Sequence, residues 1–215
     1  MTKRLKAAER RATILAVAKV LFADKGYHGV SVDEIATRLG VSPAVLYQHF
    51  PSKEALYEAV LTEIAGRRES YVEAVVAEPN DFASVLLRMT QVYARSVARD
   101  PDYLIMEMHS VLDGSAAAKQ FFTNRWKSFT DYVEYSLAEL ARDGQVDPVD
   151  PRTAGLMFQG MLREALYAKC IEKSERFRDV PLDELVDRLV AMFLQAVGYR
   201  RTRSPRRPQA ASNAR

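Results

Sequence analysis

The sequence predicts an all-α protein, and three observations lead to this class. From Lys53 onward, apolar residues recur at helical spacing, and no stretch shows a convincing β-type alternation. Short signals containing glycine or proline separate the periodic stretches. At 215 residues, the chain can hold one small and one larger domain. We expect the small domain over residues 1–55, the larger one over 56–198, and a disordered basic tail over 199–215.

The first domain is predicted to contain helices with well-marked ends. Its opening helix is amphipathic, with apolar positions at Ile14, Leu15, Ala18, Leu21 and Phe22. Ser31 is expected to cap the next helix, with Glu34 completing a capping box, and Gly40 to end it. After a short turn, Ser42 can cap a further helix, and Pro43 fits the first turn of that helix, where a missing N–H does no harm.

Residues 30–53 therefore form a helix-turn-helix pattern, which points to DNA. On its second helix, Leu46 and Phe50 share the inner side, while the outer side carries Ala44, Val45, Gln48 and His49. Small and polar outward residues suit a helix that enters a major groove. Gln48 can offer a donor and an acceptor to an adenine edge, and Val45 can contact a thymine methyl group. The alternative is that this is the solvated face of a small helical domain.

The N-terminal block closely resembles the tetracycline-repressor (TetR) family of transcriptional regulators. The matching features are the amphipathic first helix, Lys25-Gly26-Tyr27, Ser31-Val32-x-x-Ile35-Ala36, Gly40-Val41-Ser42, Leu46-Tyr47-x-x-Phe50 and Ser52-Lys53-Glu54. The close match covers about the first quarter of the chain, and the rest resembles the family only in helix number and length. The resemblance implies that Ser31, Thr37, Ser42, Tyr47 and Lys53 hold phosphates of a palindromic double-stranded operator.

The chain departs from the family pattern at one place: the family often has Lys-Gly-Thr where this chain has Pro43-Ala44-Val45. A phosphate-binding ammonium and a hydroxyl are therefore absent at these positions. Affinity for DNA should then depend strongly on two copies of the helix-turn-helix held at the right spacing.

Charge is distributed unevenly along the chain. Residues 1–55 carry +4, residues 56–198 carry −7, and residues 199–215 carry +6. Phosphate would repel the acidic middle region, so the N-terminal domain should supply the nucleic-acid surface. Its basic arm either lies close to the DNA backbone or is a disordered, solubilising tail; it comprises Lys3, Arg4, Lys6, Arg10 and Arg11. The C-terminal tail is interpreted as a solubilising extension.

The larger domain is predicted to be a series of helices. A linker helix starts near Lys53 and runs into the seventies, and others follow from about residues 82 and 101. A further long helix follows the turn at Asp113-Gly114 and stops near Gly144, and the last two long helices cover residues 151–173 and 181–198. Each of the last two helices carries two apolar stripes. On the helix over residues 151–173, Phe158 lies on one stripe and Met157 on the other. Two stripes imply two packing partners, and the resemblance implies that these helices pair two copies into a homodimer. The alternative is that both stripes are intramolecular core.

Aromatic and thioether side chains are concentrated in the middle helices. Individually each is best interpreted as core, but together they can line an apolar pocket for a small lipophilic effector, planar or acyl-chain-like. His109 can orient a polar end of such a ligand. The resemblance implies that ligand binding shifts the linker helix. The candidate residues are Phe82, Met89, Tyr93, Tyr103, Met106, His109, Phe122, Trp126, Phe129, Met157, Phe158 and Met161.

The sequence lacks the signals of an enzyme or a metalloprotein. The three histidines lie far apart, and no paired-histidine motif, phosphate-binding loop, nucleophile elbow or two-cysteine motif occurs. The single cysteine, Cys170, excludes an intramolecular disulfide and is interpreted as a small packing residue. We expect no cofactor and no metal.

The N-terminal segment is charged and amphipathic, unlike a signal peptide, and no apolar run is long enough to span a membrane, so we expect a cytoplasmic protein. The sequence as a whole predicts a homodimeric repressor that a small lipophilic ligand releases from a palindromic operator. The alternative is a constitutive DNA-binding protein without a small-molecule inducer.

Overall fold

The computed structural model describes residues 2–66, 81–112 and 116–201, and every regular element in these ranges is helical. The predicted all-α class is confirmed. The α-helices are α1 (Thr2–Lys25), α2 (Val32–Leu39), α3 (Pro43–Tyr47), α4 (Lys53–Gly66), α6 (Phe82–Arg99), α7 (Asp102–Leu112), α8 (Ala116–Arg142), α9 (Pro151–Leu166) and α10 (Leu182–Ala196).

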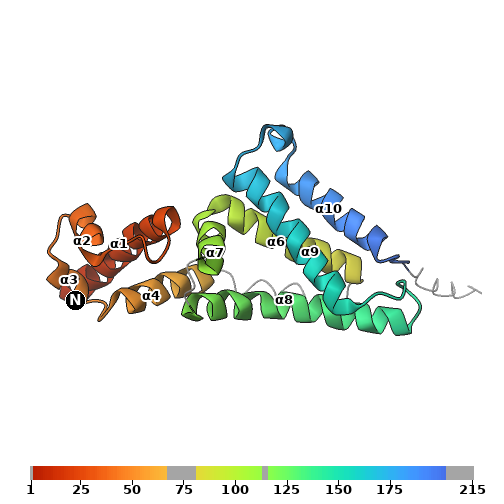
Figure 1. Cartoon of the computed structure of the whole chain (residues 1–215), viewed down its shortest axis with the longest axis horizontal. Helices are drawn as coiled ribbons and strands as arrows, with labels where there is room; N and C mark the ends of the chain where they lie inside the picture. The colour runs from red at the N-terminus through yellow and green to blue at the C-terminus, as the bar shows by residue number, and fades with distance from the viewer. Residues whose placement is uncertain (1, 67–80, 113–115, 202–215) are drawn as a thin grey trace, which may run out of the picture.

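The molecule is elongated, with α1, α2 and α3 grouped at one end and α8 running along the other part (Figure 1). We call α1–α4 the head and α6–α10 the body. In the body, α6 packs against α10, and α8 packs against α9. In the part of the chain that the structure describes, no helix is long and apolar enough to cross a membrane.

The head has its own hydrophobic cluster, which reaches beyond the head in sequence. Ile14, Phe22 and Leu46 are among its members from the first three helices, each at most 1% exposed. Body residues complete the cluster, namely Tyr103, Met106, Ala118 and Phe122. The head is therefore built partly on α7 and on the start of α8, beyond the expected sequence boundary at residue 55.

The body encloses a second cluster, centred on stacked aromatic rings. The Phe158 ring lies 5.7 Å from that of Phe129 and 4.7 Å from that of Phe193, measured between ring centres. Aspartate carboxylates cap the starts of α6 and α9. Asp81 accepts a hydrogen bond from the Ser84 N–H, and Asp150 accepts one from the Thr153 N–H, each at 2.8 Å. The predicted starts of these helices near residues 82 and 151 are confirmed.

The end of α9 differs from the expected uninterrupted helix over residues 151–173. The α-helix stops at Leu166, a π-helical turn covers Tyr167–Ile171, and a short 3-10 turn follows at Glu175–Phe177. Within the π-helical turn, the Lys169 ammonium donates hydrogen bonds to the carbonyls of Phe177 and Arg178, at 2.6 and 3.0 Å. The returning loop is thereby tied to the turn, which favours an early end of the regular helix.

The described start of the C-terminal tail lies on the body. The Tyr199 ring packs 5.8 Å from that of Phe82, the Arg200 guanidinium pairs with Asp147, and that of Arg201 lies 2.7 Å from the Asp81 carboxylate. The rest of the predicted tail, residues 202–215, lies outside the described residues, as do residues 67–80 of the predicted linker helix.

Candidate nucleic-acid interface

The helix-turn-helix forms at the predicted place, and its local signals explain why. The Ser31 hydroxyl accepts a 3.0 Å hydrogen bond from the Glu34 N–H at the start of α2. Gly40 ends α2 with a φ of 66°, a left-handed conformation that glycine adopts without strain, and its N–H points back to the carbonyls of α2. The Glu34 carboxylate forms an ion pair with Lys25 at the end of α1, which joins the first two helices.

The second helix of the motif, α3, is shorter than expected. It covers Pro43–Tyr47, and residues 48–49 form a turn. Ser42 occupies the N-cap position, but in the described structure its hydroxyl makes no capping hydrogen bond; its carbonyl instead accepts from the Val45 N–H at 3.0 Å.

The inner and outer sides of this segment agree with the spacing argument. Leu46 and Phe50 are 1% and 4% exposed and join the head cluster. On the outside, Ala44 and Gln48 are exposed, whereas Val45 and His49 are half-buried. A small, weakly polar surface is thus presented to a groove, and base contacts from these residues remain a prediction.

The candidate phosphate-binding hydroxyls differ in how free they are. The Ser31 oxygen already accepts from the Glu34 N–H, and the Thr37 hydroxyl donates to the Asp33 carbonyl at 2.8 Å. By contrast, Tyr47 is 52% exposed at the end of α3 and presents a large side chain to solvent. Thr37 is therefore the least free of these residues to donate to a phosphate, because the Ser31 hydroxyl only accepts and keeps its own proton.

Lys53 has a structural task that sequence reasoning missed. Its ammonium donates hydrogen bonds to the carbonyls of Tyr27 and Val30, both at 2.9 Å, and lies 4.3 Å from the centre of the Tyr27 ring. Lys53 is the first residue of α4, where the positive end of the helix dipole disfavours a cation. That unfavourable position was the available signal that the lysine needs local acceptors.

The basic N-terminal segment is helical, since α1 begins at Thr2. Side chains of the first residues are not described, but Arg10 and Arg11 are exposed on α1. The Arg11 guanidinium carbon lies 4.9 Å from the centre of the Phe50 ring, directly behind the outer surface of α3. Sequence spacing did not predict this stacking, which holds a positive charge beside the motif.

The aromatic and methionine residues of the expected effector pocket do not form a single group. Tyr103, Met106 and Phe122 belong to the head cluster. The members in the body cluster are Phe82, Met89, Tyr93, Trp126, Phe129 and Phe158, with Met161 packed against it. Met157 is 40% exposed on α9, and His109 is half-buried on α7. A ligand among these residues remains a prediction.

A buried carboxylate interrupts this apolar region. Glu107 is 4% exposed on α7, and its Oε1 accepts a 2.8 Å hydrogen bond from Nε1 of Trp126 on α8. The Ser110 hydroxyl, also buried, donates to the Glu107 carbonyl at 2.6 Å. Sequence reasoning did not single out Glu107, the one acidic residue among the apolar side chains near the middle of α7.

A pocket of ≈ 590 Å³ lies elsewhere, between head and body. Its walls include Leu15 and Val60 from the head and Ser96 and Pro101 from the body. None of the expected effector-pocket residues lines it.

Candidate metal ligands and the single cysteine were the remaining chemical groups to place. No group of three or more histidine, cysteine, aspartate or glutamate side chains there is arranged to hold a metal ion. Burial raises the pKa of the half-buried Cys170 thiol, which disfavours the reactive thiolate. This agrees with a packing role for Cys170.

Comparison with known proteins gives a consistent picture. The model of the family described as bacterial regulatory proteins, tetR family, matches residues 14–60. The HTH-type transcriptional activator FasR of Mycolicibacterium smegmatis is 37% identical over 118 residues, which are 54% of this chain and 54% of FasR, so the chain spans about half of that relative. The HTH-type transcriptional regulator RutR of Escherichia coli O157:H7 is 31% identical over 148 residues, covering 66% of this chain and 67% of RutR.

Solved structures extend the similarity to the body. The crystal structure of AibR in complex with isovaleryl coenzyme A and operator DNA has a TM-score of 0.67 and 25% identity. The match covers 88% of this chain and 99% of AibR. The similarity thus includes both the helix-turn-helix and the helices behind it.

Proposed function

We propose that this chain, a DNA-binding transcriptional regulator that belongs to the tetR family of bacterial regulatory proteins, acts as a homodimeric repressor. A small lipophilic ligand is proposed to release it from a palindromic operator. The observation that carries the DNA-binding part is the helix-turn-helix geometry. The orientation of α3 follows from three features: the cap of α2, the left-handed turn at Gly40 and the burial of Leu46. With Leu46 inside, the opposite side of α3 faces solvent. Regulation rather than catalysis is the activity of this family.

The outer side of α3 supports a division of tasks on DNA. Ala44, Val45, Gln48 and His49 are the residues proposed to lie nearest the bases, and the exposed side chains of Ser42 and Tyr47 are proposed to contact phosphates. Gln48→Ala should relax preference at one base pair by about 1–3 kcal/mol, because a bidentate amide contact to adenine is lost. Tyr47→Phe should weaken binding to all sequences about equally, since a phosphate contact carries no base information. Equal losses for both variants on operator and random duplexes would contradict this division.

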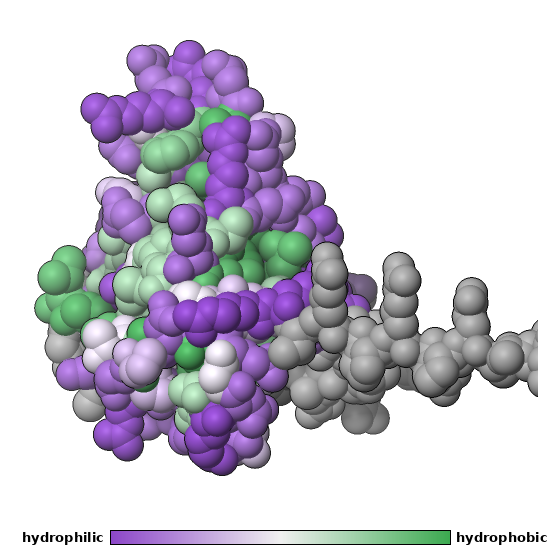
Figure 2. Space-filling view, turned by 90° about the vertical axis from the view of Figure 1, so that its right-hand side faces the viewer, coloured by the Kyte–Doolittle hydropathy of each residue, from purple (hydrophilic) through white to green (hydrophobic). Residues whose placement is uncertain are grey.

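The proposed dimer surface is the outer side of α9 and α10. On these helices, Phe158 and Phe193 are fully buried in the monomer, whereas Leu156, Met157 and Met192 are 69%, 40% and 63% exposed. Figure 2, which views the molecule from the end where α10 finishes, shows hydrophobic surface bordered by hydrophilic side chains. A second copy would cover these side chains and set the separation of the two heads. Leu189, on the same helix as Met192, is only 7% exposed and packs inside.

An acyl-type effector is proposed for the body. AibR, of similar fold, is described in complex with isovaleryl coenzyme A. Here the buried pair of Glu107 and Trp126 supplies a polar point within an apolar core, the usual composition of a small-molecule site. Trp126 is the only tryptophan of the chain, so its fluorescence reports directly on this region.

The proposal is tested by selecting bound duplexes from a random pool, with and without isovaleryl coenzyme A. We expect enrichment of inverted repeats whose half-sites lie about one helical turn (~34 Å) or a multiple apart, with release and a change in Trp126 fluorescence on addition of the acyl compound. Enrichment of unpaired half-sites would contradict the dimer. Binding that no acyl compound changes would favour a constitutive DNA-binding protein.

The direction of regulation has its own test, since the relative FasR is named an activator. A reporter placed behind the selected operator should be transcribed less in the presence of the protein. Increased transcription would show that the protein activates instead.

A further inference from the structure

Head and body meet through apolar contacts that have a pocket beside them. α1 packs against α7, and Tyr103, Met106 and Phe122 of the body complete the head cluster. Apolar burial of this kind is strong but non-directional. Next to these contacts, the pocket of ≈ 590 Å³ leaves space between Leu15 and Val60 of the head and Ser96 of the body. Packing between head and body is therefore incomplete on this side of the contact.

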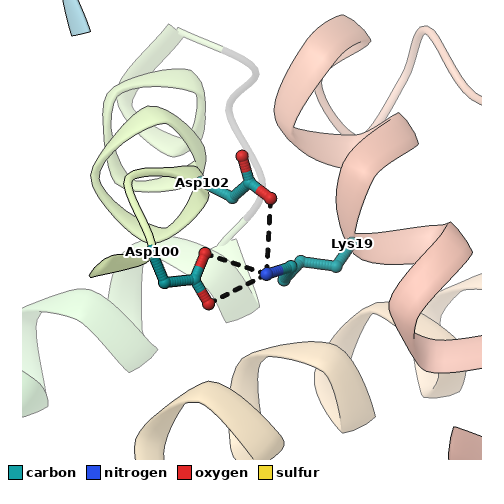
Figure 3. Close-up of polar contacts among 3 residues, drawn as sticks. All are labelled: Lys19, Asp100 and Asp102. Atoms are coloured by element: carbon teal, nitrogen blue, oxygen red, sulfur yellow. Dashed lines mark hydrogen bonds and ion pairs between the residues drawn. The ribbon is translucent and has the colours of Figure 1, made fainter. Parts of the chain in front are cut away.

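An ion cluster spans this junction (Figure 3). The Lys19 ammonium on α1 lies 2.8 Å from both carboxylate oxygens of Asp100 and 3.4 Å from Oδ2 of Asp102. The three side chains are only 25–28% exposed, so water screens them less than surface pairs. The two aspartates flank Pro101 at the corner between α6 and α7. We call these three residues the junction cluster.

Asp100 lies between two helix ends that have opposite effects on a carboxylate. It is the C-cap of α6, whose negative end disfavours the charge, and it stands two residues before α7, whose positive end favours it. Lys19 supplies the compensating charge from the other side of the junction. Two further charged residues, Glu63 and Arg99, line the adjoining pocket, so the ammonium shares this region with three carboxylates and one guanidinium, a net acidic environment.

We infer that the junction cluster of Lys19, Asp100 and Asp102 fixes the angle between head and body, and thereby the separation of the two heads in the dimer. The inference rests on the proposed function. None of the three residues is on the outer side of α3, so they act as positioning residues: the operator affinity of the dimer depends on them, whereas the affinity of one head for one half-site does not.

Duplex binding separates these two effects. Lys19→Met keeps the apolar stem and removes the charge. We expect it to lower affinity for a full operator about 5- to 150-fold, the range typical of coupling between sites, while half-site affinity stays within about twofold. Asp102→Asn, which removes only the longer contact, should cause a smaller loss. Lys127→Met is the matched control, because it removes a 2.6 Å ion pair with Asp131 that is exposed on α8.

Charge exchange distinguishes positioning from a simple packing role. Lys19→Glu should lose more full-site affinity than Lys19→Met, because like charges then meet, and the added change Asp100→Lys should restore most of it. Equal losses on half-sites and full sites, or failure of the exchange to restore affinity, would overturn the inference.

A distance measurement without DNA separates failure of this inference from failure of the proposed dimer. Spin labels at Arg38→Cys, in a Cys170→Ser background, report the distance between the heads of two copies. We expect a narrow distribution that Lys19→Met broadens. An unchanged distribution would overturn the junction cluster alone, whereas absence of any measurable distance before the Lys19 change would refute the dimer.

Discussion

The head and the body use different means to place their helices. In the head, short signals next to each other in sequence fix α2 and α3, as Ser31 and Gly40 do at the two ends of α2. In the body, long helices are placed by contacts between distant residues, such as the ring contacts of Phe158 with Phe129 and Phe193. The difference teaches that the proposed DNA-contacting surface is specified by local signals, whereas the proposed effector site depends on how the whole body packs.

The largest expected effect comes from emptying each core in turn. Phe22→Ala and Phe158→Ala remove fully buried rings from the head and the body cluster, and each should lower the free energy of unfolding by about 3–5 kcal/mol. Hydrogen exchange should show where protection is lost. Phe22→Ala should expose amides of α1–α4 and α7, and Phe158→Ala those of α6, α9 and α10. Identical patterns for the two variants would show that the clusters are one cooperative unit.

Lys53→Met tests the head alone. It removes both hydrogen bonds from the ammonium to the Tyr27 and Val30 carbonyls, and should cost about 1.5–3 kcal/mol of stability, as is typical for hydrogen bonds from a charged group. Denaturant unfolding measures the loss. Unchanged stability together with weaker binding to every duplex would instead assign Lys53 to phosphate binding.

Substitution of one glycine in each region compares how much the turns of head and body tolerate a side chain. Gly40 and Gly198 both have positive φ, 66° and 62°, so alanine should cost roughly 1–2 kcal/mol at either position. A Cβ at Gly40 would meet open space, whereas one at Gly198 would lie 2.1 Å from the Asp147 carboxylate, which pairs with Arg200. Gly198→Ala should therefore lower the melting temperature more than Gly40→Ala. The reverse order would show that Asp147 moves aside without cost.

The smallest expected effect is on the loss of thermal stability at acidic pH. The head caps α2 with the Ser31 hydroxyl, but the body caps α9 with the Asp150 carboxylate, whose pKa is lowered from 3.8 by hydrogen bonds from the Thr153 side chain and N–H. Stability from this cap is present above the unfolded pKa of about 4 and is lost as pH falls through the lower folded pKa. Asp150→Asn should flatten the decline of thermal stability below pH 4. An unchanged slope would show that the cap does not contribute to acid sensitivity.

Much of the fold was predictable because its signals are local. Ser31, Gly40 and Pro43 mark helix ends within a few residues, and the spacing of Leu46 and Phe50 identifies the inner side of α3. Helical periodicity was enough to place most body helices. It did not predict the π-helical turn at Tyr167–Ile171, which depends on a loop folding back onto Lys169.

The remaining features depend on contacts between residues far apart in sequence. Lys19 and Asp100 are 81 positions apart, and nothing near either residue indicates that they meet. Met106 and Phe122 lie in the sequence of the body but complete the core of the head. Side-chain type alone could not separate these residues from those of a body pocket, because an apolar ring serves either purpose.

Cooperation of two heads is tested most directly by the affinity of Met192→Glu for full-site and half-site duplexes. The substitution puts a charge on the exposed outer side of α10, and Val111→Glu, at a position 69% exposed on α7, is the control. We predict that Met192→Glu sediments as a 24.3 kDa monomer and binds a full site no better than a half-site, while the control keeps the full-site advantage. A monomeric Met192→Glu protein that retains full-site affinity would contradict the proposal that paired heads provide operator binding.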